Sequence, residues 1–389
     1  MLTVPFRALV LGLAGLVLAE TWARKTSRNL GPAQWLVAAV FAAMILRMLW
    51  DYTFVQLPLD LDWTYYWTMF LGGAVLPACA LLRPIDEKRL CATLLFCEVF
   101  GALALALLVA LVASRVKTPQ DLLVLRLGTE TLNPISMGHF GVSLAIVVGQ
   151  SLVLARGHST LHTTILRSLV LVVSIVVVVL SGSRGPLIAF AAAFAVFIAS
   201  FWRSIHAWLW AVFAAFAVAV IWGILEFQTE LAIVSRFSRA DVDDSNLARV
   251  SLFTGAVNQF EESPILGSAV VEYTQRFYPH NIVLESMMSL GFVGASAMII
   301  LIAISLKYCR SLLVTNGGAS PWIGLLYVQY LVDSMLSGSI ALGPQFWCVT
   351  SVVIAAANLR SVGAMIPLNR SRDSRESRLA NQRDRSDAE

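Results

Sequence analysis

Apolar residues form long uninterrupted runs along most of the chain, and short polar segments separate them. A helix needs about 20 such residues to cross the hydrocarbon core of a bilayer. By this criterion we expect about eleven spans (ten to twelve), the first of them short. The pattern therefore predicts an all-α integral membrane protein, a polytopic helix bundle. The expected spans lie at about 8–20, 33–50, 63–82, 91–114, 136–155, 164–180, 185–202, 206–225, 288–306, 320–337 and 345–359.

Two polar segments complete the domain organisation. The membrane domain, residues 1–360, includes a long loop at about 226–287. In this loop a helix beginning at Asp244 or Ser245 and ending at Ser263-Pro264 is expected to lie on the membrane surface or on the bundle. Its apolar residues recur at helical spacing: Leu247, Val250, Phe253, Val257 and Phe260. The rest, 361–389, is rich in Arg, Asp, Ser and Glu and is predicted to be a disordered cytoplasmic tail.

The loop charges predict the orientation. Lys and Arg gather in alternate loops, which marks those loops as cytoplasmic. The stretch Asp51 to Asp62 holds no Lys or Arg and belongs to the other side. With eleven spans, the loop at 226–287 lies outside and the C-terminus inside. The basic loops are those around Arg24, Lys25 and Arg28; Arg83, Lys88 and Arg89; Arg156; Arg203; and Lys307 and Arg310.

Composition excludes several classes of function. The chain has 389 residues, 58% of them hydrophobic and 13% charged, against about 25% charged in a soluble domain. This excludes a soluble enzyme, a disordered chain and a nucleic-acid-binding domain, and the net charge of +4 is too small to imply a polyanion partner. The five cysteines form no CxxC pair. No P-loop, GxGxxG or HExxH is present, and we expect neither a cofactor nor a metal site.

The segment Ser181-Gly182-Ser183-Arg184-Gly185-Pro186 joins two apolar spans that almost touch. A turn this tight places Arg184 at the outer membrane boundary. There its guanidinium can fork onto phosphate oxygens, with Ser183 beside it as a further substrate-binding candidate. The alternative is a simple turn between helices with a snorkelling arginine.

The segment from Tyr278 to Glu285 closes the long loop and opens the next helix. His280 then lies near a helix N-terminus, where the basicity of imidazole is lowered. A neutral imidazole at the water–lipid boundary can act as a general base on a sugar hydroxyl. Asn281 can cap the helix or hold the histidine tautomer, and Glu285 can orient His280 or Arg249. The alternative is a structural histidine.

Further arginines and a few intramembrane polar residues are also candidates. Arg249 lies on the expected loop helix, and Arg126 leads into a span from the outer side. Ionisable groups inside a membrane are site candidates by default. Arg47 and Asp333 fall near outer span ends, where they can pair, and Arg47 is a substrate-binding candidate. The remaining intramembrane ionisable residues are His139, near the outer end of its span, and Glu98, in the inner part.

These motifs together resemble the bacterial O-antigen ligase/polymerase superfamily. The resemblance rests on Ser-Gly-Ser-Arg-Gly at a span junction, and on an arginine ahead of Pro264-Ile265-Leu266-Gly267-Ser268. It also rests on His-Asn-x-x-Leu-Glu followed by Gly291 and Gly294. It is strongest from about 126 to 306, and the first 120 residues match only as a run of spans.

The resemblance implies a GT-C-like glycosyltransferase in the bacterial inner membrane, with its active site facing the periplasm. The donor would be a glycan on undecaprenyl pyrophosphate, and the acceptor a lipid A–core sugar or a growing glycan. Arg184 and Arg249 would bind the pyrophosphate, Arg126 would add charge, and His280 would deprotonate the acceptor hydroxyl. A single displacement inverts configuration and needs no metal.

Three other functions remain open. A polymerase of O-antigen or exopolysaccharide repeats belongs to the same class. A small-anion transporter belongs to another, although carriers tend to place polar groups at mid-membrane, whereas this chain gathers them at the outer face. A third is a structural partner among polysaccharide assembly proteins.

Overall fold

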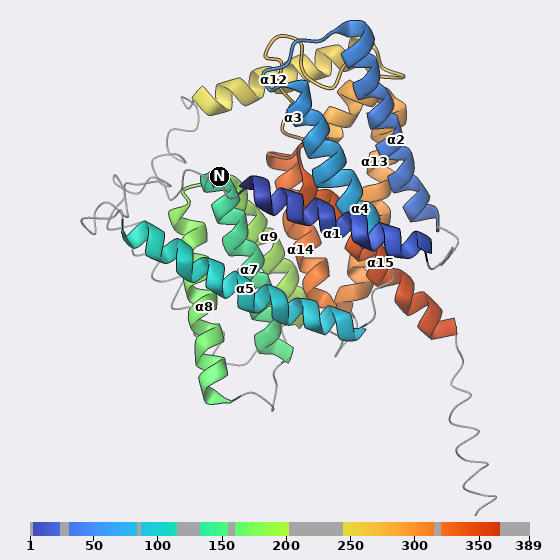
Figure 1. Ribbon diagram of the computed structural model, residues 1–389. Coiled ribbons are helices and arrows are strands. Elements are labelled where there is room, and N and C mark those ends of the chain that lie inside the picture. Colours follow the sequence, from blue (N-terminus) through green and yellow to red (C-terminus); the bar gives the residue numbers. More distant parts are fainter. Residues whose placement is uncertain are drawn as a thin grey trace, which may run out of the picture.

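A computed structural model describes residues 3–23, 31–83, 87–114, 133–154, 160–201, 244–314 and 320–365. Within these ranges the chain is helical and contains no strand. Its elements are α1 (Thr3–Ala23), α2 (Pro32–Trp50), η1 (Asp51–Val55), α3 (Trp63–Trp67), η2 (Thr68–Val75), α4 (Leu76–Leu81), α5 (Glu87–Ala113), α7 (Pro134–Leu154), α8 (Leu161–Leu180), α9 (Arg184–Phe201), α12 (Asp244–Glu262), α13 (Ile282–Val314), α14 (Pro321–Leu336) and α15 (Pro344–Met365). Figure 1 shows their order in space.

The helices coincide with the expected spans wherever the structure describes the chain. The span expected at 206–225 and the loop up to residue 243 lie outside the described residues. Six described helices are long and apolar enough to cross a membrane. The chain is therefore a multi-pass, all-α membrane protein, and the count of about eleven spans remains a prediction.

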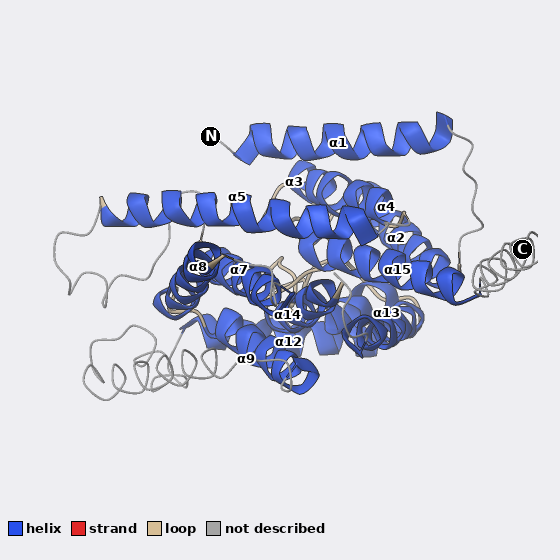
Figure 2. Ribbon diagram, turned by 90° about the horizontal axis from the view of Figure 1, so that it is seen from below, coloured by secondary structure: helices blue, strands red, loops and turns tan. Residues whose placement is uncertain are grey.

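Two helices take a course that the sequence does not predict. α7, α8, α13 and α14 run roughly parallel in Figure 1 and are seen nearly end-on in Figure 2, whereas α1 and α5 run across them in both views. α5 exposes apolar residues along its length, among them Phe96, Leu103 and Leu107. A helix that is apolar all round gives no periodic signal for its direction, so the sequence alone predicted only an apolar helix here.

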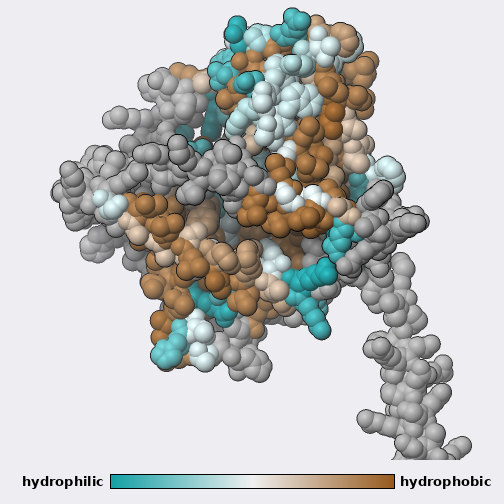
Figure 3. Space-filling view, in the orientation of Figure 1, coloured by the Kyte–Doolittle hydropathy of each residue, from teal (hydrophilic) through white to brown (hydrophobic). Residues whose placement is uncertain are grey.

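Exposed apolar side chains cover much of the surface, as expected for helices that face lipid. α2 exposes Trp35 near its beginning and Trp50 at its end, and tryptophan is enriched at both interfaces of a membrane. In Figure 3 apolar residues cover the flanks on this face, while polar residues gather at the end where α12 lies. The loop that carries the candidate site is therefore at a polar end of the bundle.

The loop helix forms where it was expected, but it packs by a different face. α12 begins at Asp244 and ends at Glu262, followed by Ser263. It buries Leu252, Ala256 and Gln259, whereas the expected stripe residues Leu247, Val250 and Phe253 are exposed. Val257 packs partly buried against Ala256 and Met288, so only the first part of the stripe is exposed, and a polar residue, Gln259, lies on the buried face. Gln259 donates to Ser268 and accepts from the amide of Tyr273.

α13 is interrupted at Gly291, where φ is +66° and the helical path breaks. The amide of Phe292 donates to the carbonyl of Pro264 at 2.7 Å, and Ser268 donates from its amide to the carbonyl of Met288 at 2.8 Å. The interruption thus frees main-chain groups of α13 to bind the Pro264–Ser268 loop. Two of the three glycine-containing motifs that supported the family resemblance, Pro264–Ser268 and the one with Gly291, meet at this contact.

The last helix, α15, extends to Met365. The expected tail boundary at 361 therefore falls inside a helix. The rest of the predicted tail lies outside the described residues.

Candidate functional site

His280 stands in a left-handed conformation, with φ +58°, directly before the first turn of α13. This conformation is uncommon for a residue with a side chain, and such positions cluster at functional sites. The ring packs edge-on against Tyr278, with centroids 4.6 Å apart. Asn281 caps the helix by accepting hydrogen bonds from the amides of Val283 and Leu284, each 3.0 Å long. The expected helix N-terminus at His280 is confirmed, and Asn281 acts as its cap.

The environment of His280 favours a neutral ring. Burial lowers the pKa of His280, and the nearby Arg249 guanidinium lowers it further, while the Ser337 carbonyl opposes the shift. Nδ1 of His280 lies 3.5 Å from the Ser337 carbonyl oxygen. Because a carbonyl only accepts hydrogen bonds, this contact favours the tautomer with the proton on Nδ1. Nε2 then carries the lone pair that a general base needs.

Tyr278 links His280 to a wider set of charged groups. Burial raises the pKa of the Tyr278 hydroxyl, and the nearby carboxylates of Glu285 and Asp333 add to the effect. Arg249 acts in the opposite direction. The Tyr278 hydroxyl therefore stays protonated at neutral pH and remains a hydrogen-bond donor beside the imidazole. Arg249, on α12, is near both rings.

The Arg184 turn reaches the same region from the other half of the bundle. Gly182, with φ +59°, makes the turn, and Arg184 is the first residue of α9. A Cβ added at Gly185 would lie 3.7 Å from the Ser337 hydroxyl and 4.0 Å from Nε2 of His139. The turn therefore lies against the same Ser337 that contacts His280.

Three separate segments thus converge around Ser337: the Arg184 turn, the His280 loop and, through His280, Arg249. The Arg184 turn leads into the N-terminus of α9, and the His280 loop leads into that of α13, where the Asn281 side chain accepts from the first amides. The arrangement brings the Arg249 guanidinium and a neutral imidazole to the turn that begins α9 with Arg184, which suits binding of a phosphorylated substrate next to a proton acceptor. Ser183 is buried beside Arg184, and Arg126 lies outside the described residues.

The Arg47 side chain binds main-chain carbonyls of a distant loop and does not pair with Asp333. It donates to the main-chain carbonyls of Leu266, Gly267 and Ser268 at 2.8–3.1 Å. Its ion-pair partner is Asp51, at 3.5 Å, which is fully buried and accepts from the amide of Val270 at 2.8 Å. The expected Arg47–Asp333 pair is therefore wrong. Main-chain acceptors bind the guanidinium, and this accounts for a half-buried arginine without a substrate.

Glu285 is also engaged elsewhere than expected. It is fully buried, and it accepts hydrogen bonds from the Ser339 hydroxyl and the Ile340 amide, each at 2.9 Å. The expected direct contact with His280 or Arg249 is replaced by contacts to the loop between α14 and α15. Because that loop includes Ser337, Glu285 supports His280 indirectly.

Ser337, in the uncharged loop at 337–343, was not among the residues expected at the site. The available signal was a second Ser-Gly-Ser, at Ser337-Gly338-Ser339, four residues after an intramembrane aspartate. The partners of the intramembrane ionisable groups were not predicted either. Nε2 of His139 lies 2.7 Å from a carboxylate oxygen of Asp333. Glu98 pairs with Arg167 at 2.6 Å, between α5 and α8.

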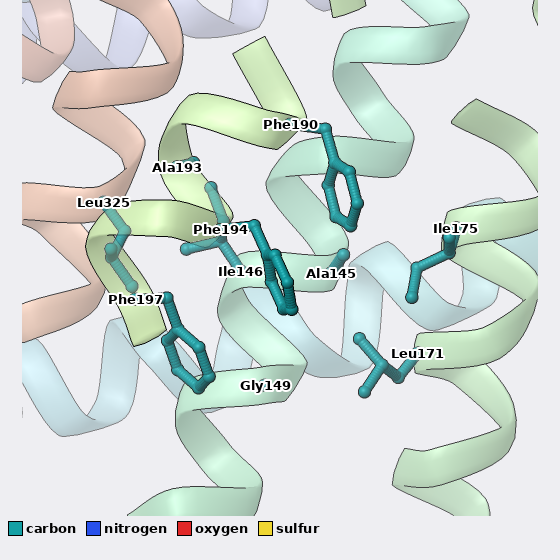
Figure 4. A pocket seen from close by; sticks show the side chains of 10 residues that line it. All are labelled: Ala145, Ile146, Gly149, Leu171, Ile175, Phe190, Ala193, Phe194, Phe197 and Leu325. Atoms are coloured by element: carbon teal, nitrogen blue, oxygen red, sulfur yellow. The ribbon is translucent and has the colours of Figure 1, made fainter. Parts of the chain in front are cut away.

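An apolar cleft lies between α7, α8 and α9, the helices that meet at the Arg184 turn. Its cavity volume is about 30 Å³, it is partly open, and Figure 4 shows its aromatic and small side chains. α9 contributes Phe190, Phe194 and Phe197 from successive turns. The other lining residues are Ala145, Ile146, Gly149, Leu171, Ile175, Ala193 and Leu325. The chemistry of this lining suits a hydrocarbon chain.

Residues 169–299 match the family model described as O-Antigen ligase. This segment belongs to the O-antigen ligase superfamily. The match confirms the resemblance inferred from the motifs, and it includes Arg184, Arg249 and His280. Arg47, Arg126, His139 and Ser337 lie outside the segment that matches the O-antigen ligase family. Among curated proteins, none matches the chain.

Proposed function

We propose that the protein is a glycosyltransferase of the outer face of the bacterial inner membrane. It moves a glycan from undecaprenyl pyrophosphate to an acceptor sugar, as in O-antigen ligation to the lipid A–core. The observation that carries the proposal is the meeting of the Arg184 turn, Arg249 and His280 around Ser337. Membership of residues 169–299 in the O-antigen ligase family supports the reaction class.

In this proposal Arg184 and Arg249 bind the pyrophosphate of the donor and stabilise the charge on the leaving group. Arg126 adds positive charge at the same side, and Ser183 borders the donor. The polyprenyl tail remains in the lipid beside the apolar helices, and the apolar surface lined by Phe190, Phe194 and Phe197 of α9 is of the same chemistry. This arrangement explains why a transferase would be embedded in the bilayer.

Nε2 of His280 takes the proton from the acceptor hydroxyl as its oxygen attacks the anomeric carbon. The new bond between this oxygen and the anomeric carbon forms while the bond to pyrophosphate breaks. Undecaprenyl pyrophosphate leaves, and configuration at the anomeric carbon inverts. Asn281 fixes the start of α13, and Glu285 and Ser337 hold the imidazole in place, so these three residues position the base.

The test is to delete the gene and separate the cell's surface polysaccharides on a gel. Loss of long chains from lipid A supports a ligase, whereas caps of a single repeat unit indicate the polymerase. An unchanged pattern contradicts both. Complementation with Arg184→Ala, Arg249→Ala or His280→Ala should fail, with transfer reduced by about 10²-fold or more. Lys88→Ala, at an exposed position outside these contacts, is the control and should complement.

A further inference from the structure

We propose that His139 is a positioning residue that, through Asp333, fixes the Arg184 turn and the His280 loop relative to each other. The catalytic role of this alignment rests on the proposed function. The contacts that suggest it are those between α7, α9 and α14. His139 lies outside the segment that matches the family.

The first step is the contact of α7 with the Arg184 turn. A Cβ on Gly138 would lie 2.6 Å from Pro186 and 2.7 Å from the Ser181 hydroxyl oxygen, so α7 touches the turn directly at this residue. The next residue, His139, is buried, and its Nε2 lies within 4.0 Å of the Cβ position of Gly185. The imidazole therefore packs against the first turn of α9.

The second step is the contact of His139 with α14. Its Nε2 lies 2.7 Å from the Asp333 carboxylate. The main-chain carbonyl of Asp333 accepts from the amide of Ser337 at 2.7 Å, and Ser337 in turn presents its carbonyl to His280. A continuous path of three contacts thus joins His139 to the imidazole at the site.

The third step is the support around the pair. Gln329 donates to the main-chain carbonyl of His139 at 2.9 Å, and Ser143 bonds with both Gln329 and Tyr330. These contacts fix α7 against α14 near the close approach of His139 to Asp333. Polar groups inside a membrane are costly unless they lie against one another. His139 and Asp333 lie between the Arg184 turn and the His280 loop. A role in aligning these two segments explains why the two side chains are there.

The experiment compares His139→Leu, which removes the ring nitrogen that lies 2.7 Å from Asp333, with His139→Gln, whose amide nitrogen can replace Nε2. Transfer is measured in nanodiscs with undecaprenyl-pyrophosphate glycan isolated from the gene-deleted cells. His139→Leu should lower kcat per folded molecule by about tenfold or more, since a small misplacement of reacting groups is costly, with a smaller change in the KM for donor. His139→Gln should restore most of kcat. Asp333→Ala should resemble His139→Leu, and the double variant should be no worse than either.

A second readout is independent of transfer. In a chain without other cysteines, Gly185→Cys and Ser337→Cys should form a disulfide readily, because the Gly185 Cβ position and the Ser337 hydroxyl are 3.7 Å apart. Adding His139→Leu should slow this reaction, and adding His139→Gln should not. Unchanged crosslinking in His139→Leu, or unchanged kcat in an active enzyme, overturns the inference. If the cysteine pair crosslinks as expected with His139 in place, and the wild-type protein transfers no glycan, the proposed function alone is refuted.

Discussion

Gly291 lies directly against the main chain of Ile265: a Cβ on this glycine would be 2.3 Å from the Ile265 carbonyl. The close approach allows the interrupted helix α13 to bind the Pro264–Ser268 loop through main-chain hydrogen bonds. Gly267 faces the same contact from the loop, with φ +72°. The loop ahead of the site is therefore locked to the helix that follows it.

Replacing Gly291 by alanine should destabilise the protein by about 2 kcal/mol or more, since both the positive φ and the steric overlap oppose a Cβ. The measurement is the thermal midpoint in detergent. Gly15→Ala is the control, because a Cβ there meets nothing within 4 Å. In a helix that change should be neutral or slightly stabilising. Equal midpoints for wild type and Gly291→Ala would contradict the locking role.

The helices and the main site motifs could be predicted from the sequence, whereas several partners could not. Apolar runs and the Asn281 cap are local signals, and they correctly placed α12 and the start of α13. The partners of Arg47 are main-chain carbonyls of a distant loop. Every residue has such a carbonyl, so the sequence does not show which of them accepts a hydrogen bond. Asp333 contacts His139 and not Arg47 because of how α7 and α14 are rotated about their axes. The sequence of a largely apolar helix has no periodic pattern from which this rotation could be predicted.

Replacing Arg47 by methionine should affect stability rather than donor affinity. The change leaves Asp51 buried with only the Val270 amide as a described partner and removes three bonds to the loop. Loss of one partner from a buried pair costs about 3–5 kcal/mol. The expected result is a lower thermal midpoint and faster proteolysis near residue 266, and Lys88→Met, at an exposed position, serves as the control. A stable Arg47→Met protein with weakened donor binding would instead support the substrate-binding role.

Glu285 and Ser339 should show graded effects on the same loop. Ser339→Ala removes one of the bonds to Glu285 and should cost about 1 kcal/mol. Glu285→Gln places an amide group where two donors now converge, so the loss should be larger, about 2–3 kcal/mol. Unfolding followed by circular dichroism measures both. If Ser339→Ala costs more than Glu285→Gln, the carboxylate is not the centre of this contact.

The pH dependence of transfer should report a neutral His280. Burial lowers the pKa of His280, Arg249 adds to the shift, and the Ser337 carbonyl opposes it, so the acid limb should lie below about 6.5. Activity should be full above this value and lost as the pH falls through the pKa of the folded state. Histidine NMR tests the cause without turnover. In Arg249→Gln the pKa of His280 should rise, because a nearby positive charge is gone, and an unchanged titration would exclude that coupling.

The orientation of the site is open to a labelling experiment. The loop charges predict that the Arg249–His280 region faces the periplasm. In a chain without other cysteines, Tyr273→Cys should react with a membrane-impermeant maleimide added to whole cells whose outer membrane has been made permeable, because Tyr273 is exposed. Lys88→Cys, in a segment predicted to be cytoplasmic, should react only after the inner membrane is opened. The reverse pattern would place the arginines where no lipid-linked periplasmic donor could reach them, and it would remove the basis for the proposed reaction.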